Sequence, residues 1–407
     1  MQEKSQPNQT QRIEIESDQR LSESIIWQIQ RAYFEKVGMG AWQGGILPHY
    51  ISSNPVMASA YCQLVFGYLR DCIGAANQGE FSFNRQAPLY IIELGAGTGR
   101  LAYHFLTQFY PRWQASPFAD IPIKFILTDF VEEIAQFWEK HPRFQEWVEL
   151  GVLDFALFDA MDLRPLYLRH AQTTLTPNMV QNPLILFANY FFDSIPQDSF
   201  VIEKGLLCEN LLSITSTQPE PDLTADGIWN RVEFLYEAIP LRKDYYEDAR
   251  YNQILASYEE EFPDTVLSFP NRGLDCLHFW QGFGNGRNLI LTADKGNTIP
   301  DSLVTQKDTM PKLHGSFSMM VNYHAINQFV FMNDGLVLNT PHYQDNLQVI
   351  AYMLGKIPQD GLETQQAFID AVVHGGPDDF FALENAITIQ YENMSLAQLL
   401  GFLRLSH

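Results

Sequence analysis

A glycine-rich loop carries the clearest chemical signal in this sequence. The apolar run at residues 89–94 leads directly into a loop with glycine at positions 95, 97 and 99, and a helical pattern starts near Arg100. Glycine adopts positive φ at little cost and puts no Cβ between the backbone and a bound molecule. Ligands of open α/β sheets bind outside the carboxyl ends of the strands. The loop therefore predicts a site for a nucleotide-type ligand.

The residues around the loop distinguish between nucleotides. The dinucleotide fingerprint GxGxxG needs a third glycine where this chain has Arg100, and no GxxxxGK[ST] loop follows a strand. Glu93, directly before the loop, would be unfavourable beside a pyrophosphate and favourable beside a cation. The pattern therefore disfavours an NAD-linked oxidoreductase and favours a nucleoside ligand that carries positive charge.

Two more acids follow the next two predicted strands. Asp129 ends the run 125–128, where a carboxylate can accept hydrogen bonds from both hydroxyls of a ribose. Asp159 ends the run 153–158. Each Asp alone could be a helix N-cap. Three acids at three successive strand ends beside a glycine loop predict one shared site.

These residues require a parallel sheet that is covered on both faces. Between residues 89 and 200, short apolar runs alternate with helical stretches, which is typical of a doubly wound α/β fold. We expect strands at 89–94, 124–128, 153–158, 184–189, 288–293 and 336–339, and helices at 21–37, 55–73, 99–109, 131–140 and 323–333.

The expected organisation has six parts. An acidic, aromatic, proline-punctuated segment interrupts the alternation after Phe200 and has the composition of an inserted lid. We expect a disordered N-terminus at 1–20, an N-terminal helical region at 21–88, a ligand-binding core at 89–202, an inserted lid or substrate subdomain at 203–287, completion of the core sheet at 288–340 and a helical C-terminal region at 341–407.

Several segments resemble a known family. The loop E-x-G-x-G-x-G at 93–99 resembles motif I of class I S-adenosylmethionine-dependent methyltransferases. The segment ANYFFDSIPQDSF at 188–200 resembles the NEFFDALP-type segment of the MidA family, which includes mitochondrial complex I assembly methyltransferases. Further landmarks of that family are similar to residues 51–55, 66–67, 289–296, 315–323, 340 and 349–355.

The resemblance implies a Rossmann-like fold, S-adenosyl-L-methionine as cofactor, no metal, and methyl transfer to a protein side-chain nitrogen, by resemblance an arginine. Asp159 would contact the adenine amino group. Asn189 and Asp193 are the candidate catalytic residues, since an amide oxygen and a carboxylate can hold an acceptor nitrogen. The candidate cofactor-binding residues are Glu93, Gly95, Ala96, Gly97, Gly99, Asp129, Phe130, Asp159, Ala160 and Asn189.

Three departures from the family pattern concern catalysis. Tyr190 stands where the family has Glu, and Ser316 and Met320 stand where it has Asp and His. These changes leave two alternatives open. The chain could be a catalytically silent assembly or interaction factor that keeps the cofactor pocket, or it could methylate a small molecule.

The charge balance excludes some classes of partner. With 26 Lys and Arg against 48 Asp and Glu, the formal charge is -22, which disfavours nucleic acid and anionic membranes. The acidic excess is concentrated at 203–275, with 15 acids and 6 bases, and at 340–407, with 8 acids and 2 bases. These segments would attract a basic or arginine-bearing protein. The oligomeric state is left open.

The four cysteines and the polar N-terminal residues bear on the compartment. No CxxC pair or zinc-ligand spacing is present, so the cysteines are expected to be packing residues in a reducing environment. The first twenty residues lack the apolar stretch of a signal peptide. We therefore expect a cytoplasmic protein.

Overall fold

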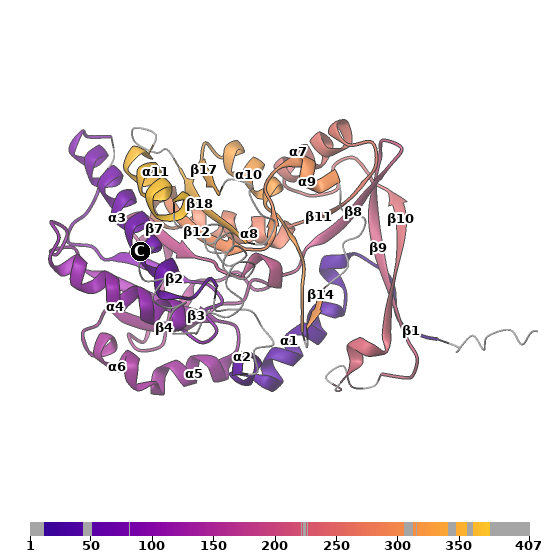
Figure 1. The fold of residues 1–407 in the computed structure, drawn as a ribbon, viewed down its shortest axis with the longest axis horizontal. Coiled ribbons are helices and arrows are strands. Elements are labelled where there is room, and N and C mark those ends of the chain that lie inside the picture. Colours follow the sequence, from indigo (N-terminus) through magenta and orange to yellow (C-terminus); the bar gives the residue numbers. More distant parts are fainter. Residues whose placement is uncertain are drawn as a thin grey trace, which may run out of the picture.

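A seven-stranded, mostly parallel sheet forms the centre of the chain (Figure 1). The computed structural model describes residues 12–43, 51–80, 82–220, 222, 225, 227–304, 312–314, 316–340, 347–355 and 361–374. In spatial order the strands are β17 (Leu336–Asn339), β18 (Gln348–Leu354), β12 (Asn288–Asp294), β7 (Leu184–Phe187), β2 (Leu89–Glu93), β3 (Ile123–Asp129) and β4 (Leu153–Leu157). Only β18 runs against its neighbours in this sheet, and the expected doubly wound α/β fold is confirmed.

The chain changes direction across the sheet between β2 and β7. It builds β2, β3 and β4 outward on one side and then returns to place β7 on the other side of β2. The loops that follow β2 and β7 therefore diverge, which opens a crevice at the carboxyl ends of these two strands. This crevice is where the glycine loop and the candidate catalytic residues lie.

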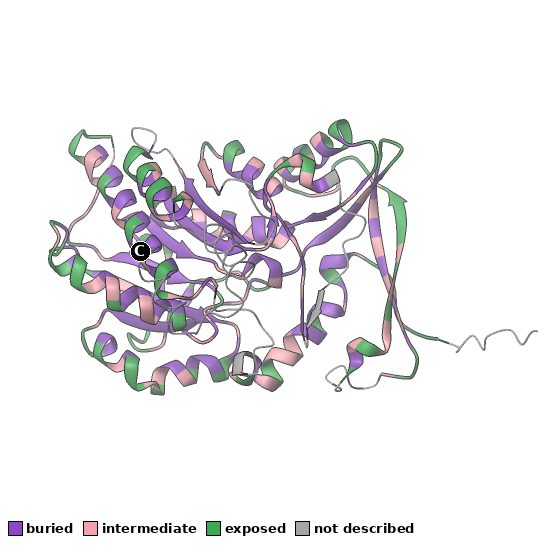
Figure 2. Ribbon diagram, viewed as in Figure 1, coloured by how far each residue is buried: buried purple, intermediate pink, exposed green. Residues whose placement is uncertain are grey.

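Helices cover both faces of the central sheet, which explains why its strands are buried throughout (Figure 2). Alternate strand residues, such as Ile91 and Ile92, pack into two separate clusters. One cluster includes α3 (Pro55–Asn77), α4 (Arg100–Gln114), α5 (Glu132–Lys140), α6 (Pro142–Glu149) and α11 (Leu362–Phe368), and the other includes α7 (Ala249–Glu261), α8 (Asn271–Gln281) and α10 (Tyr323–Met332).

A second, antiparallel sheet contains the N-terminal strand, which corrects the expected disorder at 1–20 over its described part. The sheet consists of β1 (Ile13–Gln19), β9 (Leu206–Ser216), β8 (Asp198–Glu203), β11 (Thr265–Phe269) and β10 (Val232–Pro240). The polar β1 is stabilised by pairing with β9 and by Ile15, which packs on the cluster around Trp27. Local composition cannot reveal a partner about 200 residues away.

The segment 203–287 does not form one separate lid. Its strands β9, β10 and β11 belong to the second sheet, whereas α7 and α8 pack on the central sheet. The C-terminal region expected to be helical contains the buried strand β18, whose run QVIAYML is apolar enough for a central strand. Beyond β18, α11 and the π-helical turn Ile369–Val373 are helical, and residues 375–407 lie outside the described part.

The remaining α-helices and β-strands are short, apart from α1 (Ile26–Val37), which leads into α2 (Gly40–Gln43). They are β5 (Leu166–Leu168), β6 (Thr173–Leu175), β13 (Gly296–Asn297), α9 (Pro300–Val304), β14 (Lys312–His314), β15 (Ser316–Ser318) and β16 (Val321–Asn322). Every helix within the described ranges is too short or too polar to span a bilayer.

Asp71 on α3 holds the start of α11, and its loss is expected to destabilise the fold. Its carboxylate accepts hydrogen bonds from the backbone N–H groups of Glu363 (3.1 Å) and Thr364 (2.9 Å) and from the Thr364 hydroxyl (2.6 Å). Asp71→Ala should lower the free energy of unfolding by about 1–3 kcal/mol in urea denaturation. Arg70→Ala, which breaks only the exposed ion pair with Glu363, should change it by about 0.5 kcal/mol or less. Equal effects of the two changes would contradict the capping role.

Candidate functional site

A pocket of about 270 Å³ lies at the carboxyl ends of β2, β3, β4 and β7. It gathers residues that lie as far apart in the chain as Trp27 and Ser318. The predicted site residues that line it are Glu93, Gly95, Ala96, Gly97, Asp129, Phe130, Asp159, Ala160, Asn189 and Asp193. Only Gly99 of the predicted set does not line the pocket. A Cβ on Gly99 would lie 2.9 Å from the Phe144 ring, so this glycine is required for packing.

The glycine loop has the backbone conformation that its sequence predicts. Gly95, Gly97 and Gly99 have φ values of 61°, 50° and 70°, in the left-handed region. The Gly97 N–H donates to Oδ2 of Asp129 (3.1 Å), and the Gly97 carbonyl accepts from Nε1 of Trp138 (2.9 Å). These contacts hold the loop against β3 and α5.

Asp129 joins the loop to the end of the second parallel strand. Its carboxylate accepts the N–H groups of Gly97 and, at 3.1 Å, Val131. Burial raises the pKa of Asp129 to about 6, and these hydrogen bonds partly oppose the shift. At neutral pH the Asp129 side chain is therefore mainly ionised. The residue lines the pocket.

Glu93 has one carboxyl oxygen without a partner. The residue is 5% exposed, and the backbone N–H of Ala102 donates to its carboxyl group, but Oε2 has no hydrogen-bond partner. Burial raises the pKa of Glu93 to about 8. A buried acceptor without a donor, on a pocket wall, points to a donor supplied by a ligand.

Arg31, which the sequence analysis missed, holds Asp159. Its Nη1 lies 2.6 Å from Oδ2 of Asp159, and its guanidinium lies over the Phe130 ring at 4.7 Å. The other Asp159 oxygen accepts the N–H of Met161 (2.9 Å). The Asp159 carboxylate would therefore share its hydrogen bonds between these groups and a ligand.

Helix α1 and strand β15 contribute residues to the pocket wall. Trp27 packs on Phe317 with ring centroids 4.9 Å apart, and Nε2 of Gln30 donates to the Phe317 carbonyl (2.9 Å). The lining residues that the sequence analysis missed are Trp27, Gln30, Arg31, Phe34, Lys295, Phe317 and Ser318, among others. No local pattern identifies them, because they reach the pocket only through the packing of distant elements.

Asn189 is held by two neighbours at the end of β7. Its Oδ1 accepts the Tyr61 hydroxyl (2.6 Å), and its Nδ2 donates to the Ser52 carbonyl (2.8 Å). One acceptor lone pair and one N–H remain for a ligand. Asp193 is buried nearby, and the Ser194 hydroxyl donates to its Oδ1 (2.7 Å).

Of the three departures from the family pattern, only Tyr190 lines the pocket. It has a φ of 49°, and its N–H donates to the Ala293 carbonyl (3.0 Å). Ser316 is buried, and the Met320 carbonyl accepts from Ser268 (3.1 Å). Two of the three changes therefore lie outside the pocket wall.

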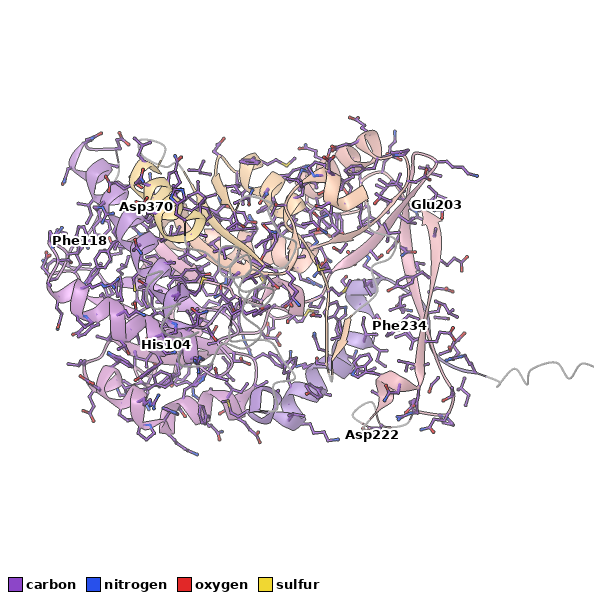
Figure 3. All side chains as sticks on the ribbon, in the orientation of Figure 1. His104, Phe118, Glu203, Asp222, Phe234 and Asp370 are labelled. Carbon is purple, nitrogen blue, oxygen red and sulfur yellow. The ribbon has the colours of Figure 1, made fainter. Side chains whose placement is uncertain are left out.

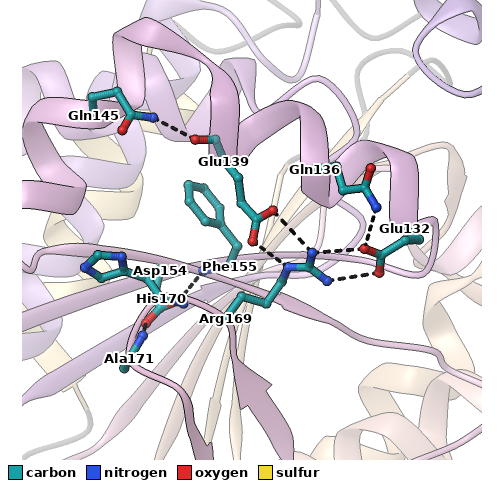
Figure 4. Close-up of polar contacts among 9 residues, drawn as sticks. All are labelled: Glu132, Gln136, Glu139, Gln145, Asp154, Phe155, Arg169, His170 and Ala171. Carbon is teal, nitrogen blue, oxygen red and sulfur yellow. Dashed lines mark hydrogen bonds and ion pairs between the residues drawn. The ribbon is translucent and has the colours of Figure 1, made fainter.

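An ion-pair network holds α5, the helix that follows Asp129 (Figure 4). Arg169, directly after β5, binds Glu132 (2.9 Å) and Glu139 (2.7 Å) at the two ends of α5. Asp154 on β4 accepts the N–H groups of His170 and Ala171. This network fixes the helix that follows Asp129.

The titratable residue His104 lies away from the pocket. His104 on α4 is outside its lining, and partial burial lowers the pKa of that imidazole (Figure 3). Among the described side chains, no three His, Cys, Asp or Glu residues are arranged to hold a metal ion.

Part of the chain is similar to a known protein family. Residues 73–269 match the family described as "Putative S-adenosyl-L-methionine-dependent methyltransferase". No curated protein matches the chain.

Similar solved structures include two proteins of one superfamily from Burkholderia thailandensis. The first, an uncharacterised protein, is 13% identical in sequence to this chain. The two superpose over 84% of this chain and 90% of that protein, with a TM-score of 0.49. The second, bound to S-adenosyl-homocysteine, is 11% identical, covers 83% and 96%, and has a TM-score of 0.46. Magnesium protoporphyrin IX methyltransferase from Synechocystis, with bound S-adenosyl-homocysteine, is 12% identical, covers 81% and 99%, and has a TM-score of 0.32.

Proposed function

We propose that this chain, an S-adenosyl-L-methionine-dependent methyltransferase, transfers the methyl group to a side-chain nitrogen of a protein, with arginine as the acceptor that the sequence resemblance to the MidA family implies. The observation that carries the proposal is that Asn189 and Asp193 line the same pocket as the glycine loop. An amide and a carboxylate beside the cofactor site suit an acceptor that is cationic or that bears N–H groups.

The pocket residues fit the cofactor. S-adenosyl-L-methionine supplies a methyl group on a positively charged sulfur. The loop from Gly95 to Gly97 would lie against it without a Cβ in the way, Asp129 would accept from the ribose hydroxyls, and Phe130 with Asp159 would flank the adenine. Glu93 would accept a hydrogen bond on its unpartnered Oε2.

The acidic surface supports a basic protein substrate. The segment 203–275, with 15 acids and 6 bases, forms much of the second sheet, and Glu233 and Glu237 are exposed on β10. A negative surface raises the rate at which a basic partner is captured.

A small-molecule acceptor is the second candidate. Trp27 and Phe317 pack on each other and line the pocket, and a wall of aromatic side chains suits a small, partly apolar acceptor.

Two measurements test the proposed function. Calorimetry should detect binding of S-adenosyl-L-methionine and S-adenosyl-homocysteine to the full chain. Cofactor with a labelled methyl group should then transfer label into proteins of a host lysate that lacks this gene product, and acid hydrolysis should release methylated arginine. Label found only in small molecules would support the second candidate, and cofactor binding with no label in any product would contradict both.

Cofactor binding is expected to strengthen as pH rises toward 8. The Glu93 carboxyl, whose pKa burial raises to about 8, is mainly protonated in the free protein at pH 7. A cationic ligand favours the ionised form, so binding should release a proton, and affinity should rise with pH and level off above about 8. Calorimetry in buffers of different ionisation enthalpy measures the release. Glu93→Gln should bind more weakly with little pH dependence, and an unchanged pH dependence in that variant would exclude Glu93 as its source.

A further inference from the structure

Two buried carboxyl groups meet at the wall of the pocket. Asp193 and Asp294 are neighbours with buried carboxyl groups, and the backbone N–H of Asp193 donates to Oδ2 of Asp294 (3.0 Å). Asp294, at the end of β12, is 0% exposed, and Asp193 is 5% exposed. Two carboxylates that are buried side by side repel each other, which favours a proton on one of them.

The surroundings allow one negative charge on the pair. Burial and repulsion between the two carboxylates raise the pKa of Asp294 well above its usual value, and burial raises that of Asp193. Within the described part of the chain, the charged or titratable groups that face the pair are Lys295, Tyr190 and Tyr323. Both tyrosine hydroxyls stay neutral because burial and the nearby carboxylates raise their pKa, so Lys295 is the cation that balances the pair.

The two acids have different access to the pocket. Asp193, Ser194 and Lys295 line it, whereas Asp294 lies behind Asp193. Glu93, whose Oε2 has no partner, lies on the wall of the same pocket. The pair is therefore beside the space that the cofactor and the acceptor would share.

We propose that Asp193 and Asp294 act as one proton acceptor in methyl transfer, with Asp193 as the catalytic residue and Asp294 as the positioning residue that shares its proton. This inference rests on the proposed function. It restricts the acceptor to a group that bears a removable proton, such as an amine or a guanidine, and it does not depend on whether that group belongs to a protein or a small molecule.

The proton balance of the step is as follows. The acceptor nitrogen uses its lone pair to form the new bond to the methyl carbon, while the carbon–sulfur bond breaks and its electron pair stays on sulfur. One N–H proton passes from the nitrogen to the free carboxylate oxygen of the pair. The pair then holds two protons and no charge, and it returns one proton to water when the product leaves.

The shared proton can be tested without an acceptor. With 13C-labelled aspartate carboxyl groups, NMR of the full chain at neutral pH should show a protonated Asp signal that Asp294→Asn removes, because an amide donor favours the ionised Asp193. Asp154→Asn, which removes another buried carboxylate, should keep that signal. A fully ionised pair in the wild type, or the same protonated signal in Asp294→Asn, would overturn the proposal.

The pH profile tests the catalytic role. In the labelled-methyl assay, Asp193→Asn should lower transfer about 100-fold or more. Asp294→Asn should shift the acidic limb of the pH profile of the transfer rate toward lower pH, by about one pH unit or more. Both variants should still bind S-adenosyl-homocysteine, which separates this proposal from the cofactor function. Absence of transfer by the wild type would refute the proposed function, whereas transfer with unshifted profiles in both variants would refute the proton acceptor alone.

Discussion

Gly97→Val is expected to abolish binding of S-adenosyl-L-methionine while the central sheet stays folded. Gly97 has a φ of 50°, where a β-branched residue is strained by about 1–2 kcal/mol or more. Relief of that strain would break the N–H bond to Asp129 and move the loop off the end of β3. The new side chain would also occupy pocket space, because Gly97 lines the pocket. Calorimetry should detect no binding, and circular dichroism should be unchanged.

Gly79→Val provides a matched control for that change. Gly79 has a φ of 79°, and no atom lies within 4 Å of the position of its Cβ. It follows the end of α3 and is not part of the pocket. This variant should lose comparable stability through backbone strain but bind the cofactor normally. Wild-type affinity in Gly97→Val would show that the loop does not approach the ligand closely.

The parts of the site that the sequence predicted are those set by local chain geometry. A parallel strand must be followed by a loop at its carboxyl end, so Glu93, Asp129 and Asp159 are placed at one edge of the sheet by the strand pattern alone. The glycine spacing then fixes where the backbone turns. The structure brings all three acids to one pocket for this reason.

The parts that the sequence analysis missed depend on contacts between distant segments. Arg31 reaches Asp159 across 128 positions, and Asp294 reaches Asp193 across 101. Asp294 follows a strand that was predicted correctly, but nothing in its own segment indicates a second carboxylate as its neighbour. Pairing between β1 and β9 is hidden in the same way, since polar strands are stabilised by their partner and not by their composition.

Asp129→Ala is expected to weaken cofactor binding by about 1.5–3 kcal/mol, or roughly 10- to 150-fold. The change removes a ribose acceptor and leaves the N–H groups of Gly97 and Val131 without their partner, so both direct and loop-mediated losses contribute.

Two further variants separate these contributions to the effect of Asp129. Asp129→Asn keeps one side-chain oxygen that can accept the Gly97 N–H, but it removes the charge, so its affinity should fall between those of wild type and Asp129→Ala. Asp120→Ala removes an exposed acid that pairs with Arg85 outside the pocket lining, and it should leave binding unchanged. If Asp129→Asn binds like wild type, the hydrogen-bonding shape of the residue matters and its charge does not. If Asp129→Ala itself binds like wild type, the end of β3 does not contact the ribose.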